Sequence, residues 1–187
     1  MNFNDPRSKL FFEFVRIKNE LQPKYFLLEN VVMKKEYENI ITDNMKVEPI
    51  LINSSLVSAQ NRKRLYWTNI KFNLPIDLNI CFNKYLYRLG HGYIKDEIKY
   101  FKKYPSLAAQ SPASKYRIID DLNKIEGIIF KDLRTSKFTR SATPEECELF
   151  QTLPKNYTSC VNKTNRYKLI GNGWTVDIIA QIFKSLS

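Results

Sequence analysis

Cysteine and histidine are scarce in this sequence, and their scarcity limits the kinds of site that it can form. The three cysteines, Cys81, Cys147 and Cys160, are scattered without a Cys-x-x-Cys pair, and the chain has 1 histidine. Such spacing argues against a disulfide framework and against a zinc site. We therefore expect no metal ion, and the unpaired cysteines favour a reducing compartment such as the cytoplasm.

Long apolar runs are also missing from the sequence. No run approaches the roughly 20 residues that a membrane-spanning helix needs. The opening letters MNFNDPRSK lack the apolar core of a signal peptide. We therefore expect no association with a membrane.

Acidic residues are few relative to basic ones. The 30 Lys+Arg residues outnumber the 19 Asp+Glu residues, which gives a formal net charge of +11. An excess of this size favours a polyanionic partner, most simply nucleic acid, although a solvated lysine surface would give the same count. The 187 residues, 43% of them hydrophobic, suffice for one domain with a real core, with or without a small insert.

The start of the chain carries the signals of an amphipathic helix. Asp5 and Pro6 are favoured at a helix start, as the N-cap and the first-turn residue. Apolar residues then recur at helical spacing until Pro23 ends the pattern. The recurring residues are Leu10, Phe11, Phe14, Val15, Ile17 and Leu21.

Strand and helix patterns alternate after this helix. Residues 25–28 and 47–53 are typical of strands, and the polar stretch 34–45 between them favours a helix. A strand, a helix and a strand within so short a span form a βαβ unit, which predicts a parallel sheet of Rossmann type. Residues 62–70 are a further strand candidate.

The middle of the chain has a weaker pattern. Residues 71–137 mix short apolar pieces with glycine and proline, which suggests an inserted small module. Regular signals return at the letters TPEE, residues 143–146, a capping box with proline at the first helical position. We therefore divide the chain into residues 1–70, the insert 71–137 and a return segment 138–187.

The return segment ends in a predicted turn and a closing helix. Gly171, Asn172 and Gly173 are typical of a turn. One face of the helix that follows would carry Trp174, Ile178, Ile182 and Leu186.

A carboxylate and an amide directly follow the apolar residues 25–28. Glu29 is costly to bury without a partner, so it is either a satisfied structural residue or the edge of a site. Ligands of parallel sheets bind beyond the carboxyl ends of the strands, which is where we expect Glu29 and Asn30.

Gln60, Arg62 and Arg64 follow one another at the period of a strand. Side chains two positions apart on a strand share a face, so both guanidinium groups are expected to point the same way. Their forked donors suit carbonyl and phosphate oxygens. Together with Glu29 they could grip a heterocycle of alternating donors and acceptors, such as cytosine. An edge strand with solvated charges is the alternative.

Four segments of the sequence, taken in order, point to one family. They are PKYFLLENVV, SAQNRKRLYW, RSATPEECELFQTLPKNYT and KLIGNGWTVDIIAQIF. They resemble the later motifs of the DNA cytosine-5 methyltransferases, in that family's order and with its variable insert between the second and the third. The resemblance implies an α/β fold, a partial Rossmann-like S-adenosylmethionine-dependent methyltransferase domain with a small inserted target-recognition module.

The resemblance also implies roles for the residues around the target base. Glu29 would contact the ring nitrogen and the exocyclic amine of a flipped cytosine, and Asn30 would shape the turn beside it. Arg64 would hold the cytosine carbonyl oxygen. Arg62 would help to order the catalytic loop and the target, and Gln60 matches the start of the same motif.

Further implied roles concern the cofactor and the DNA. Asn172, Gly173 and Trp174 would line the methionine end of S-adenosyl-L-methionine, and Arg140 would support the binding of the DNA substrate. Cations of the insert could meet phosphates or base edges, although a solvated basic surface would explain each of them equally well. These cations are Arg88, His91, Lys95, Lys99, Lys102, Lys103, Lys115 and Arg117.

The chemistry of the family explains these residue types. A cysteine thiolate adds to carbon 6 of cytosine and makes carbon 5 nucleophilic, while a carboxyl group on the ring nitrogen stabilises the developing charge. The base must first leave the duplex, at a cost of about a few kcal/mol. Phosphate contacts from lysine and arginine offset this cost.

The family's nucleophile is not found among these residues. The sequence has no Pro-Cys pair, and the glycine-rich cofactor loop is also missing. We therefore expect the C-terminal portion of a bacterial or phage methyltransferase of restriction-modification type, inactive alone and dependent on an N-terminal partner chain that supplies the cysteine. The expected substrate is double-stranded DNA. The alternatives are an inactive remnant or DNA-binding relative, and an unrelated basic nucleic-acid-binding module.

Overall fold

Local signals decide where the first two helices begin and end. The computed structural model describes residues 6–88, 97–107, 116–125 and 136–186. Helix α1, Pro6–Leu21, and helix α2, Lys35–Met45, match the two predicted helices, while Asp5 lies outside the described residues. Helix α2 ends where Lys46 adopts a left-handed φ of 60° and donates its N–H to the carbonyl oxygen of Thr42 at 2.8 Å.

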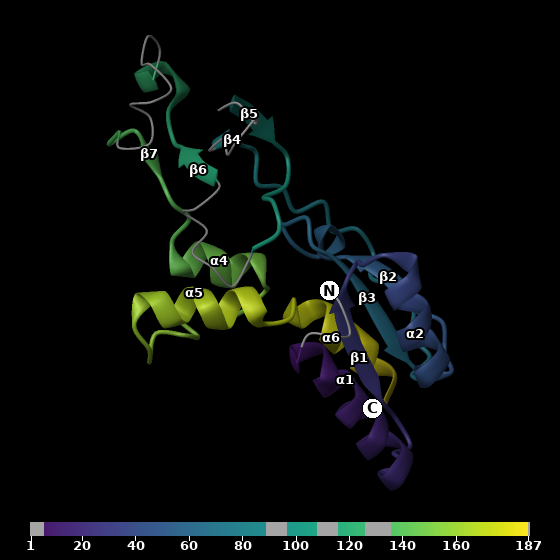
Figure 1. Cartoon of the computed structure of the whole chain (residues 1–187). Coiled ribbons are helices and arrows are strands. Elements are labelled where there is room, and N and C mark those ends of the chain that lie inside the picture. The colour runs from purple at the N-terminus through teal and green to yellow at the C-terminus, as the bar shows by residue number, and fades with distance from the viewer. Residues whose placement is uncertain (1–5, 89–96, 108–115, 126–135, 187) are drawn as a thin grey trace. The chain divides into compact units, whose positions relative to one another are not determined.

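Three strands form the first sheet, and their pairing differs from the prediction. Strands β1, Leu27–Val31, and β2, Ile50–Asn53, both pair antiparallel with β3, Lys63–Thr68, in the order β1-β3-β2 (Figure 1). The predicted βαβ pair is therefore parallel in direction, but β3 lies between its two strands. Only residues 54–62 join β2 to β3, and a parallel crossover needs about a dozen residues or more, so the short connection requires an antiparallel return.

Two strand boundaries also correct the sequence analysis. Glu29 and Asn30 lie within β1, because backbone pairing with β3 continues as far as Val31. Gln60 and Arg62 precede β3, so they do not share a strand face with Arg64. The isolated bridge between Gln60 and Tyr104 shows that this segment pairs elsewhere.

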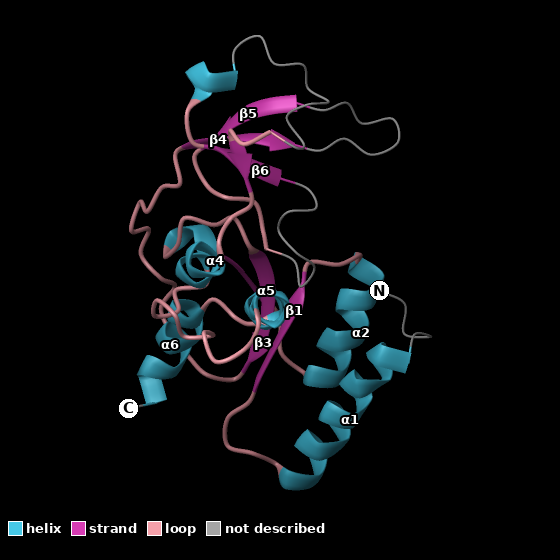
Figure 2. Ribbon diagram, turned by 90° about the vertical axis from the view of Figure 1, so that its left-hand side faces the viewer, coloured by secondary structure: helices cyan, strands magenta, loops and turns pink. Residues whose placement is uncertain are grey.

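Both early helices pack on one face of the first sheet. Leu65 and Trp67 of β3 form a buried cluster with Ile41 and Met45 of α2, and Phe14 of α1 packs against it. Figure 2 shows α1 and α2 next to each other beside β1. Because side chains alternate along a strand, the opposite face of β3 carries Arg64 and Tyr66.

A second, four-stranded sheet takes three of its strands from the predicted insert and its fourth, β7, from the return segment. All of its neighbours are antiparallel, in the order β5-β4-β6-β7. The strands are β4, Lys84–Arg88; β5, Glu97–Phe101; β6, Tyr116–Ile119; and β7, Thr139–Arg140.

The chain divides into two compact units. The first contains Met1–Asn53, Lys63–Leu74 and Ala180–Ser187, and the second contains Ser54–Arg62 and Pro75–Ile179. The functional division at residues 70 and 137 stays a prediction.

Three helices make up most of the return segment. Helix α4, Pro144–Phe150, begins with the predicted capping box, in which the Thr143 hydroxyl accepts from the Glu146 N–H. Helix α5, Lys163–Asn172, was not predicted, and it includes Gly171 and Asn172, which therefore do not form a turn. Helix α6, Val176–Phe183, begins after Trp174. Within it Ile178 and Ile182 are buried as predicted, whereas Leu186 lies beyond the helix and is exposed.

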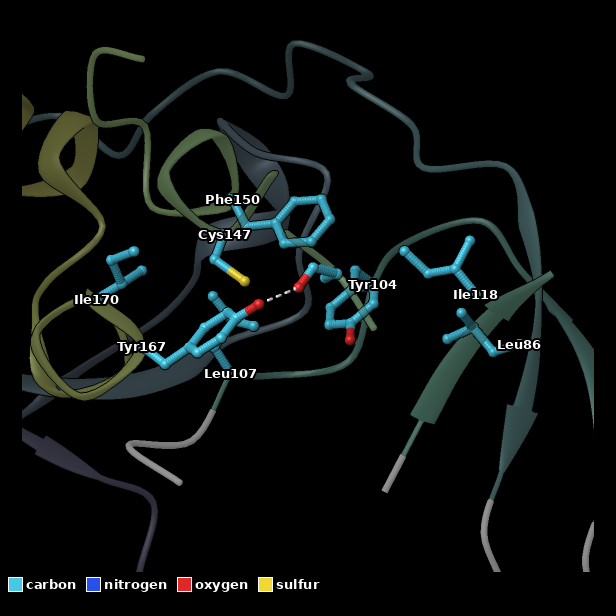
Figure 3. Close-up of a cluster of buried hydrophobic side chains, with 9 residues drawn as sticks. Leu86, Tyr104, Leu107, Ile118, Cys147, Phe150, Tyr167 and Ile170 are labelled. Atoms are coloured by element: carbon cyan, nitrogen blue, oxygen red, sulfur yellow. Dashed lines mark hydrogen bonds between the residues drawn. The ribbon is translucent and has the colours of Figure 1, made fainter. Parts of the chain in front are cut away.

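The core of the second unit joins its sheet to α4 and α5. Leu86 and Ile118 from the sheet belong to one buried cluster with Tyr104, Cys147 and Phe150 (Figure 3). The rings of Tyr104 and Phe150 are stacked with centroids 4.6 Å apart. Burial raises the pKa of the Cys147 thiol to about 12, so this cysteine is a packing residue.

Candidate functional site

An ion pair links the edge strand β1 to the central strand β3 of the first unit. Nε of Arg64 lies 2.8 Å from Oε1 of Glu29, and the side chains are 14% and 15% exposed. The register pairs Glu29 with Tyr66, one step along the same face from Arg64, so the two side chains meet diagonally across the sheet. The expectation that Glu29 and Arg64 face the same way is met.

The remaining contacts of Arg64 orient its guanidinium group. Nη1 donates to the carbonyl oxygen of Lys63 at 2.8 Å, so two of its three nitrogens are engaged. A carboxylate accepts from ring N–H and amine groups, and a guanidinium donates to carbonyl oxygens. Side by side on one face, Glu29 and Arg64 therefore match the donor and acceptor edge of a flat heterocycle.

Asn30 is directed differently from Glu29. It pairs in register with Leu65, a member of the cluster under α1 and α2, so it lies on the opposite face of the sheet. Its Oδ1 accepts from the N–H of Val31 at 2.8 Å. This local bond shapes the end of β1.

Gln60 and Arg62 belong to the second unit and are buried within it. Gln60 is 0% exposed; its amide donates to the carbonyl oxygen of Phe150 at 2.9 Å and accepts from the N–H of Leu107 at 2.9 Å. Arg62 is 4% exposed. Its Nη1 donates to Leu107 at 3.0 Å, and its Nη2 donates to Gly171 at 3.3 Å and Gly173 at 3.0 Å, in each case to the carbonyl oxygen.

Three further residues extend this buried network, and sequence reasoning missed them. Gln151 donates from Nε2 to the carbonyl oxygens of Ile170 at 2.9 Å and Gly173 at 3.3 Å. Its Oε1 accepts from the hydroxyl of Thr175 at 2.8 Å, and that hydroxyl lies 2.7 Å from the hydroxyl of Ser54. The only signal in the sequence was a glutamine that follows the apolar end of a predicted helix.

The residues predicted for the cofactor lie at the end of α5 and in the link to α6. Asn172 is exposed, and Trp174 is 45% exposed. A Cβ added at Gly173 would come within 3.1 Å of the carbonyl oxygen of Leu169, so the backbone passes close to the helix end. An exposed amide and an exposed indole on a closely held backbone could hold one end of a small ligand.

Arg140 has its guanidinium group occupied by neighbouring carboxylates. Nε donates to Asp120 at 2.7 Å, and Nη1 and Nη2 donate to Glu146 at 2.7 Å and 2.9 Å. These hydrogen bonds raise the pKa of Arg140. The side chain thus ties the end of β6 to the capping residue of α4, which is a supporting position.

Some of the cations predicted to contact DNA are bonded to other groups of the protein, whereas others are exposed. Nζ of Lys103 donates to the carbonyl oxygens of Ser55 at 2.7 Å and Ser58 at 3.1 Å, and also to that of Ile80. Arg88 pairs with Glu97, and Arg117 bonds to Thr139. Lys99 and Lys102 are exposed. His91, Lys95 and Lys115 lie outside the described residues.

The described residues contain neither a membrane-spanning helix nor a cluster of metal-binding side chains. No helix there combines the length and the hydropathy that a bilayer crossing requires. Nor do three or more His, Cys, Asp or Glu side chains gather there as they would to hold a metal ion.

Comparison with known proteins identifies the family of the chain. The profile of the C-5 cytosine-specific DNA methylases matches residues 1–126 and 85–187. Type II methyltransferase M.FnuDI of Fusobacterium nucleatum is 34% identical over 106 residues, covering 51% of this chain and 30% of its own length. Type II methyltransferase M1.ScrFI of Lactococcus lactis subsp. cremoris is 27% identical over 100% of this chain and 57% of its own length.

The fold is shared with a solved methyltransferase. The crystal structure of the S. pombe Dnmt2 methyltransferase has a TM-score of 0.61 and 19% sequence identity, over 100% of this chain and 74% of that one. The chain is thus a mixed α/β, Rossmann-like methyltransferase fold that spans only part of its curated relatives. Since the family profile covers the sequence from end to end in two overlapping matches, the chain belongs to the C-5 cytosine-specific DNA methylase family.

Proposed function

We propose that this chain holds the target base for a DNA cytosine-5 methyltransferase. Glu29 and Arg64 would contact a cytosine that has been flipped out of the duplex. The observation that carries the proposal is their ion pair of 2.8 Å on one face of the sheet, with both side chains largely shielded from water. A shielded pair of opposite charges suits a flat polar base better than a solvated surface does.

The pair explains the chemistry that each residue would perform. The carboxyl group of Glu29 would bond to the ring nitrogen and exocyclic amine, where charge develops as the thiolate adds to carbon 6. Arg64 would donate to the ring carbonyl oxygen. Without the base the two charges neutralise each other, so neither is left unpaired in a poorly hydrated position.

Asn172 and Trp174 would contact S-adenosyl-L-methionine. The exposed amide of Asn172 can both donate and accept, which suits the amino and carboxyl groups at the methionine end. The indole of Trp174 offers an apolar face, and the close backbone at Gly173 limits how far the loop can shift. The cofactor supplies the methyl group. These residues fit one part of it, and the rest of the cofactor site would come from elsewhere.

The positive charge of the chain supports DNA as the substrate. The formal net charge is +11, and Lys99 and Lys102 on and next to β5 are exposed. Cations of this kind would contact phosphates of double-stranded DNA, and the affinity would then fall steeply with salt. We propose that the second sheet and its loops provide the recognition module.

A second methyltransferase segment would complete the enzyme. Strand β1 is at the edge of its sheet in the order β1-β3-β2, and large apolar side chains are exposed near it, among them Leu10 and Leu21 of α1 at 70% and 74% and Val32 at 52%. Edges and apolar patches of this kind favour a protein partner. We propose that an N-terminal segment with a Pro-Cys loop covers this surface and supplies the nucleophile.

The experiment that tests the proposal is methyl transfer from tritiated S-adenosylmethionine to DNA. The chain is assayed alone and together with candidate N-terminal segments that carry a Pro-Cys loop. We expect transfer only in the mixture, and Glu29→Gln should lower its rate by about 10²- to 10⁴-fold. Glu36→Gln, which changes an exposed carboxylate of α2, is the matched control and should leave the rate unchanged.

Each result separates the alternatives. Transfer by the chain alone would contradict the need for a second segment. A mixture that is active but indifferent to Glu29→Gln would contradict the role of Glu29 in holding the base. A chain that binds DNA but gives no transfer with any segment would be the inactive relative.

A further inference from the structure

We propose that Arg62 is a positioning residue for residues 171–174, where α5 ends and its link to α6 begins, and that through this segment it sets the affinity for S-adenosylmethionine. The inference rests on the proposed function for the identity of the ligand. It differs from a role for Arg62 at the target base or the catalytic loop. Its evidence is the set of carbonyl oxygens that the guanidinium group contacts.

Arg62 reaches this segment through hydrogen bonds from its buried guanidinium group to backbone carbonyl oxygens. The side chain is 4% exposed, and its Nη2 donates to the carbonyl oxygens of Gly171 at 3.3 Å and Gly173 at 3.0 Å. Gly171 lies in the last turn of α5, and Gly173 is its C-cap. The last carbonyls of a helix have no partner within the helix and carry partial negative charge, so a cation here is stabilising.

A second buried side chain, at the C-cap of α4, holds the same segment. Gln151 donates to the carbonyl oxygens of Ile170 and Gly173, and it accepts from the hydroxyl of Thr175. It also accepts, through its own backbone carbonyl, the N–H of Val176 at 3.0 Å. The backbone is thereby fixed on both sides of Trp174.

Between these fixed points lie the side chains proposed to meet the cofactor. Asn172 and Trp174 are exposed while the backbone around them is held by buried donors. The backbone at Gly173 also lies close to the end of α5, since a Cβ added there would be 3.1 Å from the carbonyl oxygen of Leu169. A ligand therefore meets a surface that is already ordered, which reduces the entropy lost on binding.

The third contact of Arg62 adds the segment that leaves the second sheet. Nη1 donates to the carbonyl oxygen of Leu107 at 3.0 Å, while the N–H of Leu107 is held by Gln60. Arg62 therefore bridges two chain segments with the fork of its guanidinium group. A lysine has one compact ammonium group and cannot reproduce this bidentate geometry.

The test uses Arg62→Lys, which keeps the charge but removes the fork, with Lys168→Met on the exposed side of α5 as the matched control. The first readout is amide hydrogen exchange without cofactor. We expect the amides of Gly173 and Val176 to exchange about tenfold faster in Arg62→Lys, equivalent to about 1.4 kcal/mol, while those of α2 are unchanged. The control should behave as the wild type at all of these amides.

The second readout is binding measured by equilibrium dialysis, with the completing segment present. Arg62→Lys should weaken S-adenosylmethionine binding by about tenfold or more and change DNA affinity by less than about twofold. Acrylamide quenching adds an independent check, because Trp174 is exposed and the other tryptophan, Trp67, is 0% exposed. Quenching of Trp174 should change in Arg62→Lys and not in Lys168→Met.

Three outcomes decide the matter. Unchanged amide exchange at Gly173 and Val176 in Arg62→Lys would overturn the positioning role, whether or not the affinity for S-adenosylmethionine changes. Faster exchange with unchanged cofactor affinity but reduced DNA affinity would also overturn it, in favour of a target-side role. If the wild type binds no S-adenosylmethionine, the proposed function fails while the exchange result still tests the positioning role. Should Arg62→Lys not fold, Gln151→Met removes the other donor to Gly173 and is expected to act in the same direction.

Discussion

Arg62 and Arg64 are separated by one residue, yet they belong to different units and have different kinds of partner. Arg64, in the first unit, pairs with the Glu29 carboxylate and is 14% exposed. Arg62, in the second unit, is 4% exposed and holds backbone carbonyl oxygens on two other segments. One sequence motif therefore contains a cation that pairs with a carboxylate and a cation that holds backbone carbonyl oxygens.

The difference shows how to separate binding from support when both use the same residue type. A buried guanidinium group that donates to three backbone carbonyls has little capacity left for a substrate, and its loss removes buried hydrogen bonds. A guanidinium group paired with one carboxylate can exchange that partner for a ligand. The first unit thus holds a carboxylate–guanidinium pair on its sheet, whereas the second unit uses buried polar groups to hold its loops.

The largest expected effect is on stability, where the two arginines should differ. Arg62→Met removes buried hydrogen bonds to the carbonyl oxygens of Leu107, Gly171 and Gly173 and should lower the free energy of unfolding by about 2–4 kcal/mol. Arg64→Met removes one ion pair and one backbone hydrogen bond at a partly exposed position and should cost about 1–2 kcal/mol. Urea unfolding of both variants measures the contrast. Equal losses would show that Arg64 is as much a structural residue as Arg62.

Local signals made most of the helices predictable. Pro6 begins α1 and the Thr143–Glu146 capping box begins α4, because both signals act within one helical turn. Helix α5 was missed for a physical reason. Only Tyr167, Ile170 and Gly171 of its ten residues are buried, while Leu169 is exposed, so it has no clear apolar stripe.

The sheet and the buried network depended on contacts that no local pattern encodes. The antiparallel placement of β3 between β1 and β2 follows from the short link, residues 54–62, rather than from the strand pattern. The partners of Arg62 lie 45 and 111 residues away along the chain, at Leu107 and Gly173. In sequence, a buried arginine bound to carbonyl oxygens cannot be told from one that faces a ligand.

The next largest effect is on the pH dependence of stability, where two carboxylates should differ: Glu148 of the second unit and Glu29 of the first. Glu148 is 0% exposed and accepts from the N–H of Asn156 at 2.6 Å, from the N–H and hydroxyl of Thr158 at 2.9 Å and 2.6 Å, and from Arg166 at 2.9 Å. Burial acts to raise the pKa of Glu148, but these hydrogen bonds overcome it and lower the pKa.

A depressed pKa in the folded state means that Glu148 stabilises the fold at neutral pH. This contribution is complete above the unfolded pKa of about 4.3 and is lost as the pH falls through the lower folded value. Glu148→Gln should therefore cost about 2–4 kcal/mol at pH 7 and progressively less below pH 4. Glu29→Gln should change stability by about 1 kcal/mol or less. Urea unfolding between pH 3 and 7 checks both, and a loss independent of pH would contradict the account.

A smaller effect should separate two lysines of the insert. Lys103 donates to the carbonyl oxygens of Ser55, Ser58 and Ile80, so Lys103→Met should lower the free energy of unfolding by about 1–2 kcal/mol and leave DNA affinity nearly unchanged. Lys99 is exposed, so Lys99→Met should leave the free energy of unfolding unchanged. It should reduce the slope of log DNA affinity against log salt concentration by about 1. Fluorescence titrations at several salt concentrations measure the DNA affinity of each variant. A smaller salt slope in Lys103→Met, with none in Lys99→Met, would place Lys103 rather than Lys99 at the DNA.

The smallest expected effects are those of the cysteines. Nucleophilic cysteines need thiolate character, but the pKa of Cys147 is raised to about 12 by burial, and Cys81 donates its thiol to the carbonyl oxygen of Asn79 at 3.2 Å. Exposed Cys160 should react with a thiol reagent in the native protein, and Cys147 only after unfolding. In the completed enzyme, Cys81→Ser and Cys160→Ser should each change methyl transfer by less than about twofold. A loss above about tenfold in either would locate the nucleophile in this chain and remove the reason for a second segment.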